Sequence, residues 1–330
     1  MRIVLLGDVM LGRLVDRRLA AAPPEYPWGD TLPLLRSADA LMANLECVIA
    51  DRGEPRPGKT FTFRSSAAHV AVLTAARVTA VSLANNHSMD YGPLALQDCL
   101  ALLADHGIGS AGAGLSIEAA RRPAEFGASG VRVACLAFTD NEPAWEAGPH
   151  PGTHYVPLDP GDPRFGRLLA DIAETKRRSD VLVVSGHWGP NWGYAPLKEH
   201  VRAAHLFVDE GADVVCGHSP HVVRGIELYR GRPILYSCGD FIDDYAVDTV
   251  ERNDEACVFC LDYDGTDLRR ILVVPTMIAR LRATLAQGID RERIARTMQT
   301  LCARLNTECE LIADGLRILP RRTHGDTSPS

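Results

Sequence analysis

The sequence predicts an α/β fold in which two β-sheets pack face to face between layers of helices. Over the first two thirds of the chain, β-branched and nearly continuous apolar runs alternate with helix-like segments. Such runs are typical of strands buried on both faces. After residue 222 the pattern changes to strand–turn–strand units, which favours a more antiparallel block. Packing this block on the βα units, with helices outside, buries the apolar face of every element.

The elements of the first block can be placed from their periodicity and their boundary residues. The expected strands are residues 3–7, 40–46, 78–83, 131–138, 181–185 and 214–216. The expected helices are residues 14–22, 66–76, 93–106, 167–178 and 197–210. Pro93 suits a first helical turn, and Gly107 and Gly211 suit the position just after a helix end.

The second block predicts strands 222–229 and 233–237, and a hairpin of 256–263 with 268–274 around the turn at Asp264-Gly265. An amphipathic helix is expected over residues 290–310, with Ile294, Met298 and Leu301 on one face. We therefore expect one main domain over residues 1–277. A helical extension, residues 278–319, should pack on it, and residues 320–330 should form a disordered tail.

Composition excludes several classes of function. The chain has 330 residues, of which 46% are hydrophobic and 23% charged, with a net charge of −7. This charge argues against nucleic acid or an anionic membrane as a partner. No apolar run reaches eighteen residues, and the nine cysteines are odd in number without a secretory signal. Reduced thiols and a cytoplasmic location without a membrane anchor are expected. Nothing in the sequence excludes an oligomer.

Polar side chains follow several of the predicted strands at the point where each strand ends. They are Asp8, Glu46, Asn86, His87, His187, His218 and His221. Each alone is more often structural than functional. Together, carboxylate, amide and imidazole groups at successive strand ends would meet at one edge of the fold, where a divalent-metal site is built. The sequence therefore predicts a metal-dependent enzyme.

Motifs along the first 245 residues resemble the CapA family, which is named for poly-γ-glutamate capsule synthesis and belongs to the calcineurin-like metallophosphoesterase superfamily. The motifs occur in the family's order. They are the segments 7–13 (GDVMLGR), 44–46 (NLE), 61–64 (FTFR), 82–92 (SLANNHSMDYG), 186–189 (GHWG), 217–221 (GHSPH) and 236–241 (YSCGDF). The resemblance implies an α/β/β/α sandwich of two mixed sheets, with residues 1–277 as the catalytic domain.

The resemblance also implies a set of metal ligands. Asp8 and His221 would bind a first metal, Glu46 would bridge two metals, and Asn86, His187 and His218 would bind the second. The chain departs from the superfamily pattern at three points: Met10 replaces a histidine, Glu46 replaces an aspartate, and the last histidines are spaced His-x-x-His. One or two ions of manganese, iron or zinc are expected. A single ion at Glu46, Asn86, His187 and His218 is the alternative.

Further residues are expected around the metal. By the resemblance, His87 would contact the leaving group, with Asp90 orienting its ring. Arg13, Arg64 and, less specifically, Lys59 could bind a carboxylate or phosphate, or could be surface charges. The aromatic loop with Trp188 and Trp192 is expected to form a substrate wall, the alternative being packing beneath the rim. Asp240, near Asp243 and Asp244, could contact substrate or a cation.

Three functions remain open from the sequence. The first is a CapA-like enzyme that uses Lewis-acid metal chemistry, by hydrolysis or amide formation, on an anionic amide, γ-glutamyl, peptide-like or phosphorylated small substrate. The second is a non-catalytic accessory subunit of poly-γ-glutamate-type polymer synthesis. The third is a metal-dependent phosphoesterase. A purely structural domain would leave the convergent histidines unexplained.

Overall fold

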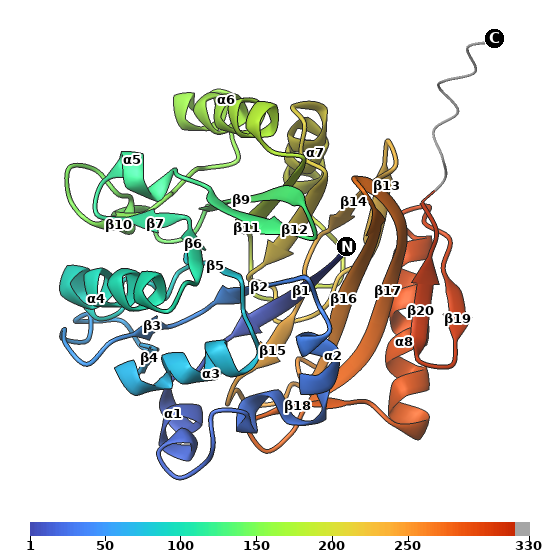
Figure 1. The fold of residues 1–330 in the computed structure, drawn as a ribbon, viewed down its shortest axis with the longest axis horizontal. Helices are drawn as coiled ribbons and strands as arrows, with labels where there is room; N and C mark the ends of the chain where they lie inside the picture. Colours follow the sequence, from blue (N-terminus) through green and yellow to red (C-terminus); the bar gives the residue numbers. More distant parts are fainter. Residues whose placement is uncertain (321–330) are drawn as a thin grey trace.

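Two β-sheets packed face to face form the centre of the computed structural model, which describes residues 1–320 (Figure 1). The larger sheet consists of β1 (Arg2–Val9), β2 (Ala40–Leu45), β5 (Ala80–Ser82), β6 (Gly109–Ala111), β15 (Asp240–Ile242), β16 (Glu255–Asp264), β17 (Asp267–Ile278), β18 (Ala283–Leu285), β19 (Glu310–Ile312) and β20 (Gly315–Ile318). Its main order is β19-β20-β17-β16-β1-β2-β5-β6, with β15 paired to β1 and β18 to β17.

The second sheet has six strands in the order β13-β14-β12-β11-β9-β8. These are β8 (Ala124–Ala128), β9 (Val131–Thr139), β11 (Val181–His187), β12 (Val214–His218), β13 (Ile226–Tyr229) and β14 (Arg232–Leu235). Two small pairs complete the strands: β3 (Val48–Ile49) with β4 (Arg64–Ser65), and β7 (Ala113–Gly114) with β10 (Gly152–Thr153).

Alternation along the central strands explains why both sheets are buried on both faces. In β1, Ile3 and Leu5 face the layer between the sheets, whereas Val4 and Leu6 belong to the outer core. In β11, Val183 lies between the sheets, whereas its neighbours belong to the core on the far side. Because side chains alternate along a strand, a continuous apolar run supplies two core layers at once.

Most of the described helices cover the outer faces of the sheets, whereas the last one packs against the layer between them. These helices are α1 (Arg13–Leu19), η1 (Tyr26–Thr31), α2 (Leu32–Arg36), η2 (Ala67–His69), α3 (Val70–Ala75), α4 (Gly92–Asp105), α5 (Ile117–Ala120), η3 (Pro143–Trp145), α6 (Pro163–Arg178), α7 (Lys198–Asp209) and α8 (Gly288–Ala303). α6 and α7 pack on the six-stranded sheet, and α3 and α4 pack on the larger one (Figure 1). The predicted α/β/β/α sandwich is confirmed.

The helix boundaries follow the capping residues. α6 begins at Asp162, whose side chain accepts a hydrogen bond from the Arg164 amide at 2.8 Å, and Pro163 occupies the first turn. Gly107 follows α4 with φ of 69°, and Gly211 follows α7 with φ of 114°. Both glycines therefore end their helices in the left-handed region that other residues rarely adopt.

The C-terminal part differs from the helical extension that the sequence predicts. Residues 278–319 contain α8 but also three strands, β18, β19 and β20, which pair with β17 or with each other. These strands are three or four residues long, too short for their periodicity to show in the sequence. Most of the predicted tail, residues 321–330, lies outside the described residues.

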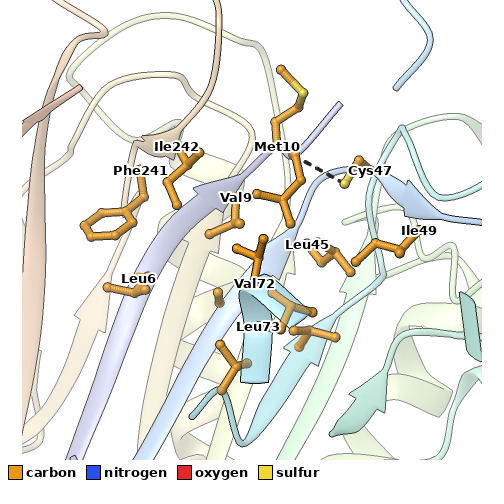
Figure 2. Packing of buried hydrophobic residues seen from close by; sticks show 14 of the residues in the cluster. Leu6, Val9, Met10, Leu45, Cys47, Ile49, Val72, Leu73, Phe241 and Ile242 are labelled. Carbon is orange, nitrogen blue, oxygen red and sulfur yellow. Dashed lines mark hydrogen bonds between the residues drawn. The ribbon is translucent and has the colours of Figure 1, made fainter. Parts of the chain in front are cut away.

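An apolar cluster supports the strand ends of the larger sheet. Figure 2 shows Leu6, Val9, Leu45 and Phe241 in one cluster with Val72, which comes from α3. All five side chains are buried. Strand ends anchored in such a close-packed core are rigid, so polar residues placed there keep their positions. Among the described residues, no helix combines the length and apolar character needed to cross a bilayer.

Candidate metal centre

Three carboxylates converge at one end of the larger sheet because its strands are in parallel register there. Asp8 of β1 is paired with Asn44 of β2 on one side and with Asp240 of β15 on the other. Glu46 directly follows β2, and its amide donates to the Val9 carbonyl at 3.0 Å. The carboxyl ends of these parallel strands therefore deliver Asp8, Glu46 and Asp240 to the same place.

The second sheet delivers histidines to the same end of the molecule. His187 of β11 and His218 of β12 are paired residues of neighbouring parallel strands. His187 Nε2 lies 4.0 Å from Glu46 Oε1, and His218 Nδ1 lies 3.0 Å from Asp8 Oδ1. These contacts join the two sheets, so the predicted convergence of Asp8, Glu46, His187 and His218 is present in the structure.

The tightest group of potential ligands consists of Asp8, Glu46, His221 and Asp240. One ligand atom from each lies within 4.8 Å of all the others. His221 Nδ1 is 2.9 Å from Asp240 Oδ1, and the Tyr245 hydroxyl donates to Glu46 Oε2 at 3.0 Å. The three carboxylates are at most 1% exposed. Asp240 therefore lies in this cluster itself, whereas the sequence left open whether it contacts substrate or a cation.

Burial and close like charges shift the pKa values of the groups in this cluster. Burial raises the pKa of Glu46 well above its usual range, and the charge of Asp8 adds to this rise. Burial likewise raises the pKa of Asp240, helped by Asp243 and Asp8. Burial lowers the pKa of His187 to about 3. Burial also opposes protonation of His218, but its contact with Asp8 outweighs this and raises the pKa to about 10.

Orphaned polar atoms test whether a metal fits here. Among the buried side-chain atoms of the described residues that have no hydrogen-bond partner, four lie here: Asp8 Oδ2, Asn86 Oδ1, His187 Nε2 and Asp240 Oδ2. Buried polar atoms are rarely left unpaired unless something else satisfies them. All four are oxygen or nitrogen atoms of the types that bind manganese, iron or zinc. The residues present therefore fit a divalent metal.

Two asparagines that sequence reasoning missed hold the ligands in place. Asn44 Nδ2 donates to Asp8 Oδ1 at 2.9 Å, and Asn85 Nδ2 donates to Asn44 Oδ1 at 3.0 Å and to the Leu45 carbonyl at 2.8 Å. This amide chain links β1, β2 and the turn after β5. The signal was available in the sequence, since Asn44 is two residues from Glu46 and Asn85 precedes Asn86.

His87 and Asp90 form a hydrogen-bonded pair beside the cluster. His87 Nδ1 is 2.6 Å from Asp90 Oδ2, and the His87 ring stacks on Phe63 with centroids 3.9 Å apart. Burial lowers the pKa of His87 although Asp90 opposes this. The imidazole is therefore neutral near pH 7, and the Nδ1 contact leaves Nε2 as the nitrogen open to other groups.

A cavity of about 550 Å³ opens beside His87 and the cluster of carboxylates with His221. His87, Asn86 and His221 form part of its lining, together with Phe61 and Tyr245. Its size suits a small molecule or a short stretch of polymer. Trp192, which is 43% exposed, lines the same cavity. Trp192 therefore lies where the sequence predicts an aromatic wall.

The cationic residues predicted for substrate binding have different surroundings. Arg13 lines the cavity, with its Nε 3.2 Å from Asp244 Oδ2. Lys59 also lines it, but its ammonium is 2.7 Å from Asp90 Oδ1. Arg64 is absent from the lining described for this cavity: its Nη1 donates to the Gly53 carbonyl at 3.0 Å, away from the cluster.

Trp188 is placed differently from the substrate wall that the sequence predicts. It is fully buried, its Nε1 donates to the Tyr236 carbonyl at 3.2 Å, and its ring stacks on His200 with centroids 5.2 Å apart. The reason is local: Gly186 and Gly217 lack side chains where the indole lies, so the ring packs beneath the rim. The alternative of packing beneath the rim fits this residue.

Comparisons with known proteins agree with this geometry. A family model described as bacterial capsule synthesis protein PGA_cap matches residues 2–245. A probable polyglutamine synthesis accessory protein of Mycobacterium tuberculosis is 34% identical over 333 residues, covering 96% of this chain and 84% of the relative. The PGA biosynthesis protein CapA of Bacillus subtilis is 30% identical over 241 residues, covering 72% of this chain and 62% of the relative.

Two solved structures share the fold. A hypothetical protein from Thermus thermophilus aligns with a TM-score of 0.52 and 17% identity, over 84% of this chain and all of the other. A candidate 5′-nucleotidase from Staphylococcus aureus aligns with a TM-score of 0.51 and 16% identity, over 93% of this chain and 58% of the other. At these identities the likeness concerns the fold alone, and it agrees with the metallophosphoesterase-like sandwich.

Proposed function

Since this chain belongs to the bacterial capsule synthesis protein family PGA_cap, we propose that it is a metal-dependent enzyme acting on an anionic amide or γ-glutamyl substrate. One observation carries the proposal: unpaired, buried ligand atoms from both sheets converge beside a His–Asp pair at the floor of a cavity. A purely structural domain has no reason to leave these atoms unpaired.

The ligand set divides into two groups. Asp8, Glu46, His221 and Asp240 would hold one ion, and Glu46 with Asn86, His187 and His218 could hold a second. Manganese, iron or zinc bound there would polarise a carbonyl or phosphoryl oxygen and lower the pKa of bound water. Asp240 would supply a ligand in place of the histidine that Met10 replaces; the Met10 sulfur is buried and accepts the Gly12 amide at 3.0 Å.

The other side chains have roles that follow from their contacts. Asp90 holds Nδ1 of His87, so His87 can exchange a proton at Nε2 with a group in the cavity. Arg13 presents a guanidinium to the same cavity and is the residue suited to a substrate carboxylate. Phe61 and Trp192 flank the opening and exclude water from the apolar part of a bound chain.

The test is an assay of the metal-loaded and metal-free protein against γ-glutamyl amides and against p-nitrophenyl phosphate mono- and diesters. We expect metal-dependent turnover of the amides. His87→Asn should keep the metal and lose roughly 100-fold or more of the rate, as is usual when a general acid–base group is removed. Turnover of phosphodiesters alone would contradict the amide proposal and support a metal-dependent phosphoesterase.

A second candidate function is an accessory subunit that binds the polymer without catalysis. The name of the Mycobacterium tuberculosis relative favours it, as does Met10 in place of a metal-binding histidine. A His87→Ala protein that kept full function in a reconstituted polymer synthesis would support this candidate.

The cytoplasmic location stays a prediction, supported by nine free cysteines, none of which forms a disulfide within the described residues.

A further inference from the structure

The ammonium group of Lys59 is occupied by the protein rather than offered to a ligand. Lys59 Nζ donates to Asp90 Oδ1 at 2.7 Å and to the backbone carbonyl of Asn86, and it lies 4.1 Å from the Trp145 ring centre. Two of the three ammonium hydrogens are used in these hydrogen bonds, and Glu142 Oε1 lies 3.8 Å from the same nitrogen. Only 16% of the side chain is exposed. Lys59 therefore has little capacity left to bind a substrate anion.

Asp90, whose carboxylate Lys59 contacts, bonds both to His87 and to the connection between β3 and β4. Its Oδ2 lies 2.6 Å from His87 Nδ1 and accepts the Phe63 amide at 2.7 Å. The backbone carbonyl of Asp90 accepts the Arg56 amide at 2.7 Å. Asp90 is fully buried. One residue thus orients His87 and also anchors the connection between β3 and β4.

That connection forms one wall of the cavity. Its residues 56–63 have no helix or strand, so hydrogen bonds to the rest of the protein hold them. Lys59, Phe61 and Phe63 from this segment line the cavity, and the Phe63 ring stacks on His87. Three hydrogen bonds, from Arg56, Lys59 and Phe63, all end on Asp90. Detaching Asp90 would therefore release the wall and the histidine together.

We propose that Lys59 is a positioning residue that couples the closed conformation of segment 56–63 to the orientation of His87 through Asp90. Lys59 supplies the counter-charge of a buried carboxylate and fixes it so that its second oxygen faces Nδ1. When the segment opens, Lys59 leaves Asp90, and His87 loses its orientation. The proposal rests on the function proposed for His87, since it explains how that residue is held ready.

The experiment compares Lys59→Met with Lys59→Arg in the full chain. ¹⁵N-histidine labelling reports the Nδ1 hydrogen bond of His87 by NMR, and hydrogen exchange with mass spectrometry follows segments 56–63 and 86–91. Lys59→Met should abolish the hydrogen-bonded Nδ1 signal and speed exchange in both segments by roughly tenfold to hundredfold, the factor expected for a lost hydrogen bond to a charged group. Lys59→Arg should restore the signal and most of the protection.

Arg52→Met is the matched control, because Arg52 lies in the same connection but pairs with Asp98, and its side chain is 61% exposed. It should change neither measurement. An unchanged His87 signal in Lys59→Met, or faster exchange confined to segment 56–63, would overturn the coupling. Neither measurement needs a substrate, so the coupling can hold even if the proposed reaction fails. Where turnover is measured, Lys59→Met should lower kcat more than it raises KM; a residue that grips substrate would raise KM and leave the His87 signal intact.

Discussion

Asp8 and Asp240 are paired residues of the neighbouring parallel strands β1 and β15, and their carboxylates lie in one buried cluster with Glu46. Strand pairing holds the backbones of these two residues side by side, so their carboxylates project from neighbouring positions. Three buried acids at this distance repel each other unless protons or a cation neutralise them. The cluster therefore has a strong electrostatic reason to bind a positive ion.

Metal binding should stabilise the fold measurably. Adding manganese or zinc at a hundredfold excess over the dissociation constant should raise the free energy of unfolding by about 2.7 kcal/mol, and a chelator should reverse this. Asp240→Asn should remove most of the effect, because it deletes a ligand and a charge. Asp267→Asn, at an exposed hairpin tip, is the control. Thermal unfolding measures the stabilisation by the metal, and mass spectrometry measures how much metal is bound. If the metal stabilised Asp240→Asn as much as the natural chain, the ion would bind elsewhere.

Metal affinity should increase with pH. The raised pKa values of Glu46 and Asp240 mean that the metal-free cluster holds protons that an ion must displace. Titration calorimetry in two buffers with different ionisation enthalpies should show proton release on binding. The apparent affinity should rise from pH 6 to pH 8. Equal heats in the two buffers would show that no proton leaves, contrary to this interpretation.

Asp244 should control anion binding through Arg13. Arg13 has φ of 54°, a left-handed conformation that is strained for a residue with a side chain. Asp244 maintains it by accepting the Leu14 amide at 3.0 Å and lying 3.2 Å from Arg13 Nε. Asp244→Asn should weaken binding of a γ-glutamyl oligopeptide by roughly tenfold, the cost of one charge-assisted hydrogen bond. Calorimetry at constant metal loading measures the affinity for the oligopeptide. Arg13→Lys should weaken binding to a similar degree. If neither variant changed the affinity, Arg13 would not be part of the binding site.

The sequence predicts most of the residues that converge here, because they directly follow long apolar strands. Asp8, Glu46 and His187 are of this kind. For Asp240 the sequence does not choose between substrate and cation, because its place in the cluster depends on β15 pairing with β1, a contact between distant parts of the chain that no local pattern reveals. The buried position of Trp188, which differs from the predicted substrate wall, is hidden from the sequence for a similar reason. The room for its ring comes from Gly186 and Gly217, which lie on two paired strands.

Those glycines are directly testable. A Cβ at Gly217 would lie 2.6 Å from Trp188 Nε1 and 2.3 Å from the Tyr236 carbonyl oxygen, which is backbone and cannot yield cheaply. Gly217→Ala should therefore cost about 1–3 kcal/mol of unfolding free energy, as overpacking usually does. It should also weaken metal binding, because it displaces the neighbouring His218. Gly127→Ala, where a Cβ meets nothing within 4 Å, is the control and should be close to neutral. Urea denaturation distinguishes the two variants.

Acid sensitivity should come in part from His154. Its Nδ1 lies 2.9 Å from the Ala137 carbonyl oxygen, and burial lowers its pKa from 6.5 to about 4. Below pH 6.5 the unfolded chain takes up a proton that the folded protein refuses, so stability falls as the pH drops from about 6.5 towards 4. Each pKa unit corresponds to about 1.4 kcal/mol, so the total loss is about 3 kcal/mol.

His154→Gln should therefore show a smaller decrease in unfolding free energy between pH 7 and pH 5 than the natural chain, whatever its absolute stability. Urea denaturation at the two pH values gives this difference directly. His106→Gln, at the exposed end of α4, should keep the natural slope. If the unfolding free energy of His154→Gln fell with decreasing pH as steeply as that of the natural chain, the acid sensitivity would come from other groups that are buried in the neutral form. His187 is the first of these to examine, because burial lowers its pKa to about 3.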